Sequence, residues 1–262
     1  MMKLGIIKGY GEDSFRYAKA HQLDFLEICS NYDHDSQAFL QAESEIKNRI
    51  QRYGLPVLSV GRWNSLPIKE GHIDRDVVEL LKKQIQTTAS IGCPVFHLGV
   101  NRDQSVTLYQ NYVLAVEYLR EMCGFAGEKG VTLSLYNCSW ENFLCESKAW
   151  DIVLPELPQM MLKYDCSHSY GRGADYLAEL YQWAPRVVHM HVKGTSMIGS
   201  TYVDDPPAGL DALNWRRIFS ILYAKGYDKT LSIEPHSSVW QGELGEKGVQ
   251  FTIQFIRPFL MR

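Results

Sequence analysis

The chain has 262 residues, of which 45% are hydrophobic and 12% aromatic, a composition that suits one large globular domain. Its formal net charge is −3 and it has no basic tract, which argues against nucleic acid as a partner. No stretch approaches the roughly 18 consecutive apolar residues of a membrane span. The first residues lack the apolar core of a signal peptide, and the six cysteines form no CxxC pair. These features favour a cytoplasmic protein with free thiols.

Short apolar runs recur along the whole chain, and each is the length of a buried strand. They predict eight strands, at residues 4–7, 25–28, 56–60, 95–99, 131–135, 160–164, 187–192 and 230–233. Longer segments with helical spacing lie between them, with helices predicted at 36–53, 76–91, 106–129 and 214–225. Glycines follow three of these segments, at Gly54, Gly130 and Gly226, and are typical helix stops.

Eight strand–helix units in about 260 residues are typical of a (β/α)₈ TIM barrel, here predicted as a single domain over residues 1–262. An open, doubly wound sheet is the alternative. The sequence KGYGED after the first strand has two glycines but lacks the GxGxxG register of a dinucleotide-binding loop. The barrel is therefore the favoured fold.

Polar residues collect where the predicted strands end, which is where TIM barrels carry their active sites. In VVHMHVKG, residues 187–194, His189 and His191 share one face of a strand because side chains alternate along it. The strand ends supply these candidate site residues: Arg62, His97, Tyr136, Asn137, Asp165, His168, His191, Lys193, Glu234 and His236.

Three of these residues come from consecutive strand ends and offer oxygen and nitrogen donors: Asp165, His191 and Glu234. Such a mixed set suits a divalent ion such as Mn²⁺, Co²⁺, Zn²⁺ or Mg²⁺. His189 would either orient a ligand or bond a backbone carbonyl, and Glu27 is equally well explained as a structural carboxylate inside the barrel. Asp211 is expected to cap the helix that follows it.

Five motifs in chain order resemble those of the xylose isomerase-like sugar phosphate isomerase/epimerase family. They are LDFLEICS on the second strand, YDCSH for D-x-x-H, HMHVKG for H-x-H-x-K-D, the loop PPAGLDALNW, and GYDKTLSIEPH at the last strand. The resemblance implies a TIM barrel with a divalent metal on Asp165, His191 and Glu234. It also implies that Glu234 acts as an acid or base and that His168 contacts substrate.

The sequence departs from the family pattern at two positions. Tyr136 stands where the family has a metal-binding glutamate on the fifth strand, and Gly194 replaces the aspartate after Lys193. A tyrosine, with an ordinary pKa of about 10, cannot replace a carboxylate near neutral pH. Glu141, five residues further on, is the nearby carboxylate that could fold back in its place.

These observations predict a metal-dependent isomerase or epimerase that removes a proton next to the carbonyl of a sugar or keto-sugar. Glu234 and His168 are the expected catalytic residues. Substrate contacts are expected from Lys193, Asn137, Tyr136, His97, His236 and Arg62. Two alternatives use the same pocket: a keto-sugar or polyol dehydratase, and a non-catalytic carbohydrate-binding relative that lost the glutamate. A DNA-repair endonuclease fits poorly, because only eight histidines are present and the charge is negative. The expected partner is a small sugar or polyol, and neither a membrane nor nucleic acid is expected to bind. Homo-oligomerisation is left open.

Overall fold

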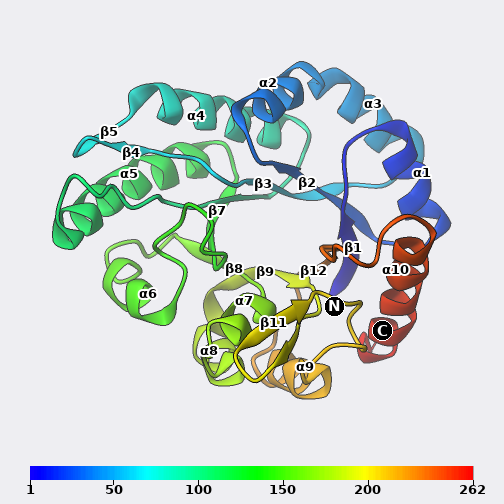
Figure 1. Ribbon diagram of the computed structural model, residues 1–262. Helices are drawn as coiled ribbons and strands as arrows, with labels where there is room; N and C mark the ends of the chain where they lie inside the picture. Colours follow the sequence, from blue (N-terminus) through cyan, green and yellow to red (C-terminus); the bar gives the residue numbers. More distant parts are fainter. Residues whose placement is uncertain (262) are drawn as a thin grey trace.

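The computed structural model describes residues 1–261 as a closed barrel of eight parallel strands surrounded by helices (Figure 1). Around the barrel the strand order is β1, β12, β9, β8, β7, β6, β3 and β2. The strands are β1 (Lys3–Ile7), β2 (Phe25–Ser30), β3 (Val57–Arg62), β6 (Val95–Leu98), β7 (Thr132–Tyr136), β8 (Met161–Tyr164), β9 (Val187–Val192) and β12 (Thr230–Ile233). The predicted (β/α)₈ barrel and its eight strands are confirmed.

The helices connect consecutive strands and cover the outside of the barrel. They are α1 (Glu12–Ala20), α2 (Asp33–Gln41), α3 (Glu43–Tyr53), α4 (Arg75–Ser90), α5 (Leu108–Glu128), α6 (Ser147–Val153), α7 (Cys166–Gly171), α8 (Tyr176–Trp183), α9 (Trp215–Ala224) and α10 (Gly242–Ile256). Two 3₁₀ turns lie at Ala184–Arg186 and Arg257–Phe259. In the described part of the chain, no helix has the length and apolar character needed to cross a membrane.

The prediction of one helix over residues 36–53 is wrong. The segment forms two helices, α2 and α3, which meet at Ala42, whose ψ of 2° is not helical. The break redirects the chain so that Phe39 of α2 and Ile46 of α3 are both fully buried in the core. Packing therefore overrides the continuous helical pattern. The predicted stop at Gly54 is confirmed, since Gly54 has a left-handed φ of 55°.

The interior of the barrel is filled by side chains of alternating strand positions. Gly5 of β1 leaves room for the ring of Phe25 on β2, because a Cβ at Gly5 would lie 2.6 Å from that ring. The Phe25 ring lies edge-on to His189 of β9, with 6.2 Å between ring centroids. This end of the barrel is therefore apolar, and the polar inward-facing residues lie toward the C-terminal ends of the strands.

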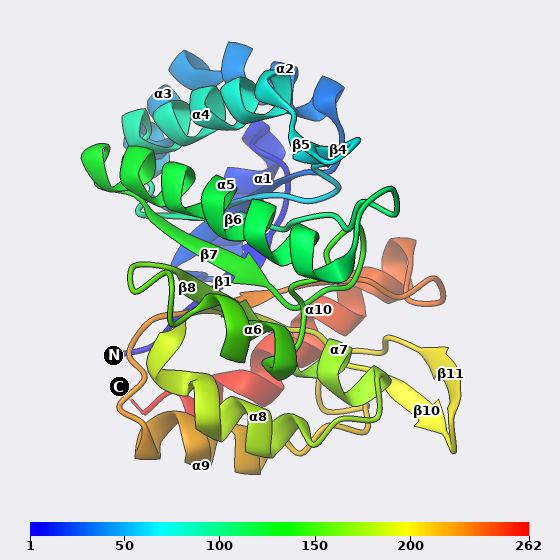
Figure 2. The same ribbon diagram turned by 90° about the vertical axis from the view of Figure 1, so that its left-hand side faces the viewer.

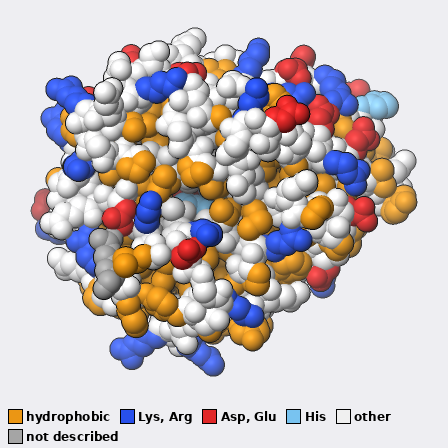
Figure 3. Space-filling view, turned by 180° about the vertical axis from the view of Figure 1, so that it is seen from behind, with side chains coloured by type: hydrophobic (Ala, Val, Ile, Leu, Met, Phe, Trp, Pro, Cys, Tyr) orange, Lys and Arg blue, Asp and Glu red, His pale blue; other side chains and the backbone are white. Residues whose placement is uncertain are grey.

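Two short hairpins extend from the loops on the side where the strands end, as Figure 2 shows. They are β4 (Ile68–Lys69) with β5 (His72–Ile73), and β10 (Ser196–Ile198) with β11 (Thr201–Asp204). The two termini lie close together on the opposite side (Figures 1 and 2). On the face that Figure 3 shows, Lys and Arg side chains are interspersed with Asp and Glu.

Candidate active site

The polar cluster at the barrel mouth is built by strand alternation. Lys163 and Asp165 lie two residues apart at the end of β8, and His189, His191 and Lys193 follow the same spacing along β9. The two sets of side chains lie next to each other, because β8 and β9 are paired in a register that sets Lys163 opposite His189. Since inward-facing positions recur every second residue, all these side chains enter the same space.

The structure brings Asp165, His191 and Glu234 together at one point. Each offers a ligand atom, and these atoms lie within 4.8 Å of one another. His191 Nδ1 lies 3.0 Å from Glu234 Oε2. Asp165 Oδ1 accepts a hydrogen bond from the amide of Ser167, whereas its Oδ2 is buried without a hydrogen-bond partner. A buried carboxylate oxygen without a partner is costly unless a cation compensates it.

Glu27 of β2 anchors two histidines and is fully buried. Its carboxylate accepts hydrogen bonds from His191 Nε2 at 3.1 Å and from His189 Nε2 at 2.9 Å. His189 Nδ1 lies 2.6 Å from the hydroxyl of Thr230. The structure thus places Glu27 inside the barrel as the carboxylate that fixes the ring of His191, with Nδ1 turned toward Glu234.

A second group of metal-type donors lies deeper in the barrel: Glu27, His97 and His189. His97 is fully buried, with Ser59 Oγ at 3.0 Å from Nε2 and Ser134 Oγ at 2.5 Å from Nδ1. Burial lowers the pKa of His97 well below its ordinary value. Both ring nitrogens are occupied by hydroxyl groups, so this group forms a hydrogen-bonded layer beneath the mouth.

Charge at the mouth is set by competition between burial and ion pairing. Burial and Lys163 lower the pKa of His191, but Glu27 and Glu234 outweigh them and raise it to about 9. Burial raises the pKa of the Glu234 carboxyl, but His191 and Lys193 hold it well below its ordinary value. Glu234 is therefore ionised at neutral pH.

The same competition sets the charges of Asp165 and of the two basic side chains nearest to it, Lys193 and His168. Burial raises the pKa of Asp165, yet Lys193 and His168 lower it below its ordinary value. Burial lowers the pKa of Lys193, but Asp165, Glu234 and Asp205 raise it above its ordinary value. Burial lowers the pKa of His168 to about 3, against the opposing effect of Asp165, so this imidazole is neutral.

The residues present fit a divalent ion at the mouth. Asp165 Oδ2 has no hydrogen-bond partner, Lys193 Nζ lies 3.6 Å from it, and Glu234 is ionised. Glu27 holds Nε2 of His191, and an ion at Nδ1 would displace the proton that the raised pKa of His191 keeps there. A carboxylate that hydrogen-bonds the far nitrogen of a ligating histidine is a usual feature of metal centres. The spacing of the three donor atoms allows one ion to contact all of them.

A cavity of about 130 Å³ opens beside this cluster. Its walls come from the ends of seven strands and the loops that follow them. Its lining residues are Ile7, Cys29, Asn31, Trp63, Cys138, Trp140, Lys163, His168, Lys193, Glu234 and His236. Asp165 and His191 are buried behind this surface. Four predicted site residues thus line the cavity, namely His168, Lys193, Glu234 and His236.

Tyr136 and Asn137 do not line this cavity. The Tyr136 ring stacks on Trp63 with 5.3 Å between centroids, and its hydroxyl donates to the carbonyl of Trp140 at 3.4 Å. Asn137 bonds both backbone groups of Asp165, through Nδ2 at 2.8 Å and Oδ1 at 2.9 Å. Tyr136 therefore supports the Trp63 wall, and Asn137 positions Asp165.

His97 and Arg62 also lie away from the cavity. His97 belongs to the deeper layer described above. Arg62 donates to the carbonyl of Trp63 at 2.6 Å and to Asp33 at 2.5 Å, and it borders a separate outer groove next to Leu66. Glu141, which could have replaced the missing glutamate, is solvent-exposed and does not line the cavity.

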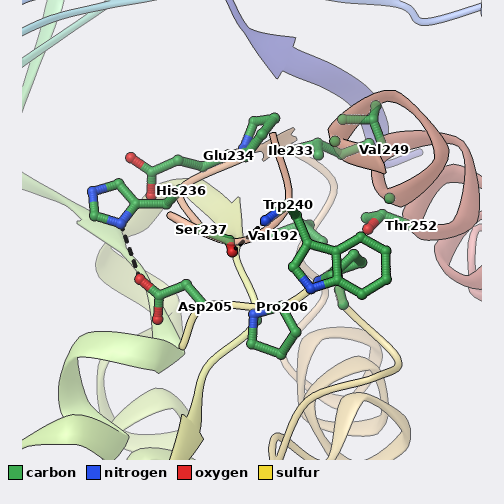
Figure 4. Close-up of a pocket in the computed structure, with 16 residues that line it drawn as sticks. Val192, Asp205, Pro206, Ile233, Glu234, His236, Ser237, Trp240, Val249 and Thr252 are labelled. Carbon is green, nitrogen blue, oxygen red and sulfur yellow. Dashed lines mark hydrogen bonds and ion pairs between the residues drawn. The ribbon is translucent and has the colours of Figure 1, made fainter. Parts of the chain in front are cut away.

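The loop after β11 explains the glycine at position 194. A Cβ on Gly194 would lie 2.0 Å from the carbonyl oxygen of Pro206, so a side chain cannot fit there. Figure 4 shows Pro206 beside Trp240 in a small cavity of about 30 Å³ that borders Glu234. The same view shows the hydrogen bond of 2.9 Å between His236 Nδ1 and Asp205, which ties the β12 end to this loop.

The prediction that Asp211 caps a helix is wrong. Asn214 caps α9 by accepting from the amide of Arg217 at 3.1 Å. Asp211 accepts from the amide of Gly209 and the indole of Trp215, both at 2.9 Å. It therefore holds the loop in place instead of beginning the helix.

Sequence reasoning missed Lys163. Its side chain is only 1% exposed, and its Nζ lies 5.8 Å from the centroid of the Trp63 ring at the cavity wall. The available signal was its position two residues before Asp165, which places both on one face of β8.

The closed barrel is a TIM barrel, and this cluster lies at its C-terminal mouth, the end where TIM-barrel enzymes carry their active sites. The family model described as a xylose isomerase-like TIM barrel matches residues 15–259, and the chain belongs to this family. A search of the curated proteins finds no match to the chain.

Solved structures with the same fold include sugar epimerases and dehydratases. The E. coli 3-keto-D-glucoside 4-epimerase has a TM-score of 0.76 and 15% identity, covering 98% of this chain and 100% of that one. A D-psicose 3-epimerase from Clostridium cellulolyticum H10 has a TM-score of 0.73 and 18% identity, covering 99% of each chain. Mannonate dehydratase from Streptococcus suis has a TM-score of 0.79 and 14% identity, covering 99% of this chain and 94% of that one. At these identities the likeness establishes the fold alone.

Proposed function

We propose that the chain is a divalent-metal-dependent isomerase or epimerase of a sugar or keto-sugar, which removes a proton next to a carbonyl. The observation that carries the proposal is the convergence of Asp165, His191 and Glu234 within 4.8 Å beside a cavity at the barrel mouth. Family membership supports it, as do the sugar epimerases among the structural neighbours.

The ion would be held by Asp165 Oδ2, His191 Nδ1 and Glu234. Mn²⁺, Co²⁺, Zn²⁺ or Mg²⁺ would suit this donor set. When bound, it would polarise the substrate carbonyl and acidify the neighbouring C–H bond. Glu27 would keep His191 oriented by holding Nε2, 3.1 Å from its carboxylate.

Glu234 is the proposed base because it is ionised and lies on the cavity wall. Removing a proton next to a carbonyl leaves negative charge on the oxygen. The ammonium of Lys193, also on the cavity wall, would stabilise that charge. His168 lies 3.4 Å from Lys193 Nζ, and its neutral imidazole would contact a substrate hydroxyl and accept or return its proton.

Dehydration of a sugar or polyol is the second candidate, and the position of Tyr136 favours it. Proton exchange on both faces of a carbon calls for two acid–base groups, and family epimerases are expected to use a second glutamate where this chain has Tyr136. Of the carboxylates in residues 1–261, only Glu234 lines the cavity. Elimination needs one base and one donor for the departing hydroxyl, which Glu234 with Lys193 or His168 would supply. The fold shared with mannonate dehydratase supports this reading.

The predicted partner is a small sugar or polyol. The six free cysteines agree with a reducing cytoplasm, which stays a prediction, as does homo-oligomerisation.

The test begins with elemental analysis of the purified protein and of an Asp165→Asn variant. The metal-loaded protein is then incubated with a panel of keto-sugars in D₂O, and the C–H next to the carbonyl is followed by NMR. We expect one ion per chain, loss of the ion in Asp165→Asn, and deuterium incorporation only with metal-loaded wild type. Bound metal with no exchange across the panel, together with tight sugar binding by calorimetry, would replace the proposal with the non-catalytic carbohydrate-binding relative.

A further inference from the structure

Lys163 is a buried cation that the proposed chemistry does not use. It projects from β8 into the barrel mouth, one inward-facing position before Asp165. Its side chain is 1% exposed, yet it lines the same cavity as Lys193 and Glu234. Its ammonium therefore meets the space where a substrate would bind.

The two lysines of the cavity differ in their partners. Lys193 Nζ has Asp165 Oδ2 at 3.6 Å, and Asp205 Oδ2 and Glu234 Oε2 at 3.9 Å. Lys163 Nζ has no carboxylate within 4.0 Å and no hydrogen-bond partner anywhere in residues 1–261. Its one directed contact is with the face of the Trp63 ring, 5.8 Å from the centroid.

Asp165 and Glu234 act on Lys163 only from beyond 4.0 Å. An ammonium removed from water with no carboxylate in contact is destabilising, and a contact with an aromatic ring offsets only a small part of that cost. The neighbouring inward-facing residue on β7 is Tyr136, which packs against Trp63 and offers Lys163 no carboxylate. A charge retained at such a cost in a cavity is typical of a binding group whose partner arrives with the ligand.

We propose that Lys163 binds a carboxylate of the substrate, so that the cavity takes a sugar acid in preference to a neutral sugar. The assignment as substrate rests on the proposed function, since Glu234, which lines the same cavity, would then act on a carbon of the same molecule. A single ammonium matches a carboxylate better than a phosphoryl group, because phosphate sites usually combine several N–H donors or a guanidinium. No arginine lines this cavity in the described residues.

The experiment compares binding of matched acids and amides by calorimetry, with and without Mn²⁺. The probes are D-gluconate with D-gluconamide, and D-glycerate with its amide, which differ in charge but little in shape. We expect wild type to bind one acid at least about tenfold more tightly than its amide, as is typical of a hydrogen bond between charged groups. In Lys163→Met that preference should vanish while the affinity for the amide stays unchanged.

Two further measurements keep the outcome decisive. Lys148→Met, at an exposed position, removes the same unit of charge and should keep the wild-type preference. Ligand-free Lys163→Met should melt at or above the wild-type temperature, because it removes a buried ammonium that no carboxylate contacts. A strongly lowered melting temperature would assign Lys163 a structural role and overturn the proposal.

Equal binding of acid and amide by wild type would also overturn it, as would Lys163-dependent binding of inorganic phosphate tighter than that of either acid. The acid preference is measured without turnover. If it persists while no substrate exchanges deuterium, the proposed reaction fails and the carboxylate site stands.

Discussion

The barrel holds two neighbouring groups of histidine and glutamate that are chemically alike but differ in how their polar atoms are satisfied. In the deeper layer, Glu27, His97 and His189 bond one another or the hydroxyls of Ser59, Ser134 and Thr230. At the mouth, Asp165 Oδ2 has no hydrogen-bond partner, and Lys163 has no carboxylate within 4.0 Å among the described residues. The types of donor atom alone therefore do not identify a ligand-binding site. In the deeper layer the polar side chains bond one another or hydroxyl groups, whereas at the mouth polar atoms without such partners lie beside a cavity.

If this contrast is correct, substitutions at the mouth should change catalysis more than stability, and substitutions in the deeper layer should do the reverse. The variants below run from the largest expected effect to the smallest, and each one can break or sharpen the contrast.

Glu234→Gln should lower the rate of deuterium exchange by about 10²–10⁴-fold, the usual contribution of a positioned base. The amide keeps an oxygen that can face the ion, but it cannot take a proton. Exchange is measured by NMR on the metal-loaded protein. Glu141→Gln, at an exposed position outside the cavity, is the matched control and should exchange at the wild-type rate. A Glu234→Gln variant within tenfold of wild type would assign the base elsewhere.

Glu27→Gln should lower the free energy of unfolding by about 3–5 kcal/mol, because it leaves the buried His191 and His189 without their carboxylate. It should also weaken metal binding by about 10–100-fold, since His191 loses its anchor. Urea unfolding and metal titration measure the two effects. Glu128→Gln, on the exposed end of α5, is the control. A stability change below about 1 kcal/mol would mean that the deeper layer is not what holds the mouth in place.

Gly194→Ala should lower the free energy of unfolding by about 1–3 kcal/mol through overpacking, because the new Cβ would lie 2.0 Å from Pro206 O. Thermal unfolding measures the loss. Gly124→Ala in α5 meets nothing within 4 Å and should instead be neutral or slightly stabilising, as alanine is the better helix former. If both variants unfold like wild type, the Pro206 loop yields freely and the contact does not explain the glycine.

Tyr136→Phe should have the smallest effect, with exchange within about threefold of wild type and a stability loss of about 0.5–1.5 kcal/mol. The hydroxyl donates a long hydrogen bond of 3.4 Å to Trp140 and accepts one from the backbone of Asn64, and the ring stack on Trp63 is kept. The same NMR exchange measurement checks it. A loss beyond tenfold would show that this hydroxyl reaches the reacting atoms, as the sequence suggested.

The strands and the place of the site were predictable because both depend on local periodicity. VVHMHV forms β9 with the predicted bounds, and its alternation puts His189 and His191 on one face. Features that depend on contacts between different elements were not all predictable. Tyr136 was expected at the substrate, but stacking on Trp63 carries its ring away from the cavity. Helix 36–53 was expected to be continuous, but burial of Phe39 and Ile46 divides it.

The sequence by itself determined the eightfold strand–helix repeat and the strand ends from which the polar groups emerge, because side-chain alternation and apolar spacing are properties of the local chain. Only the tertiary structure decided which of these groups meet. Barrel closure sets Asp165, His191 and Glu234 within 4.8 Å, ties Glu27 to two histidines from a strand 162 residues away, and leaves Lys163 unpaired. Distances of that kind depend on strand register and packing across the barrel, which no local pattern encodes.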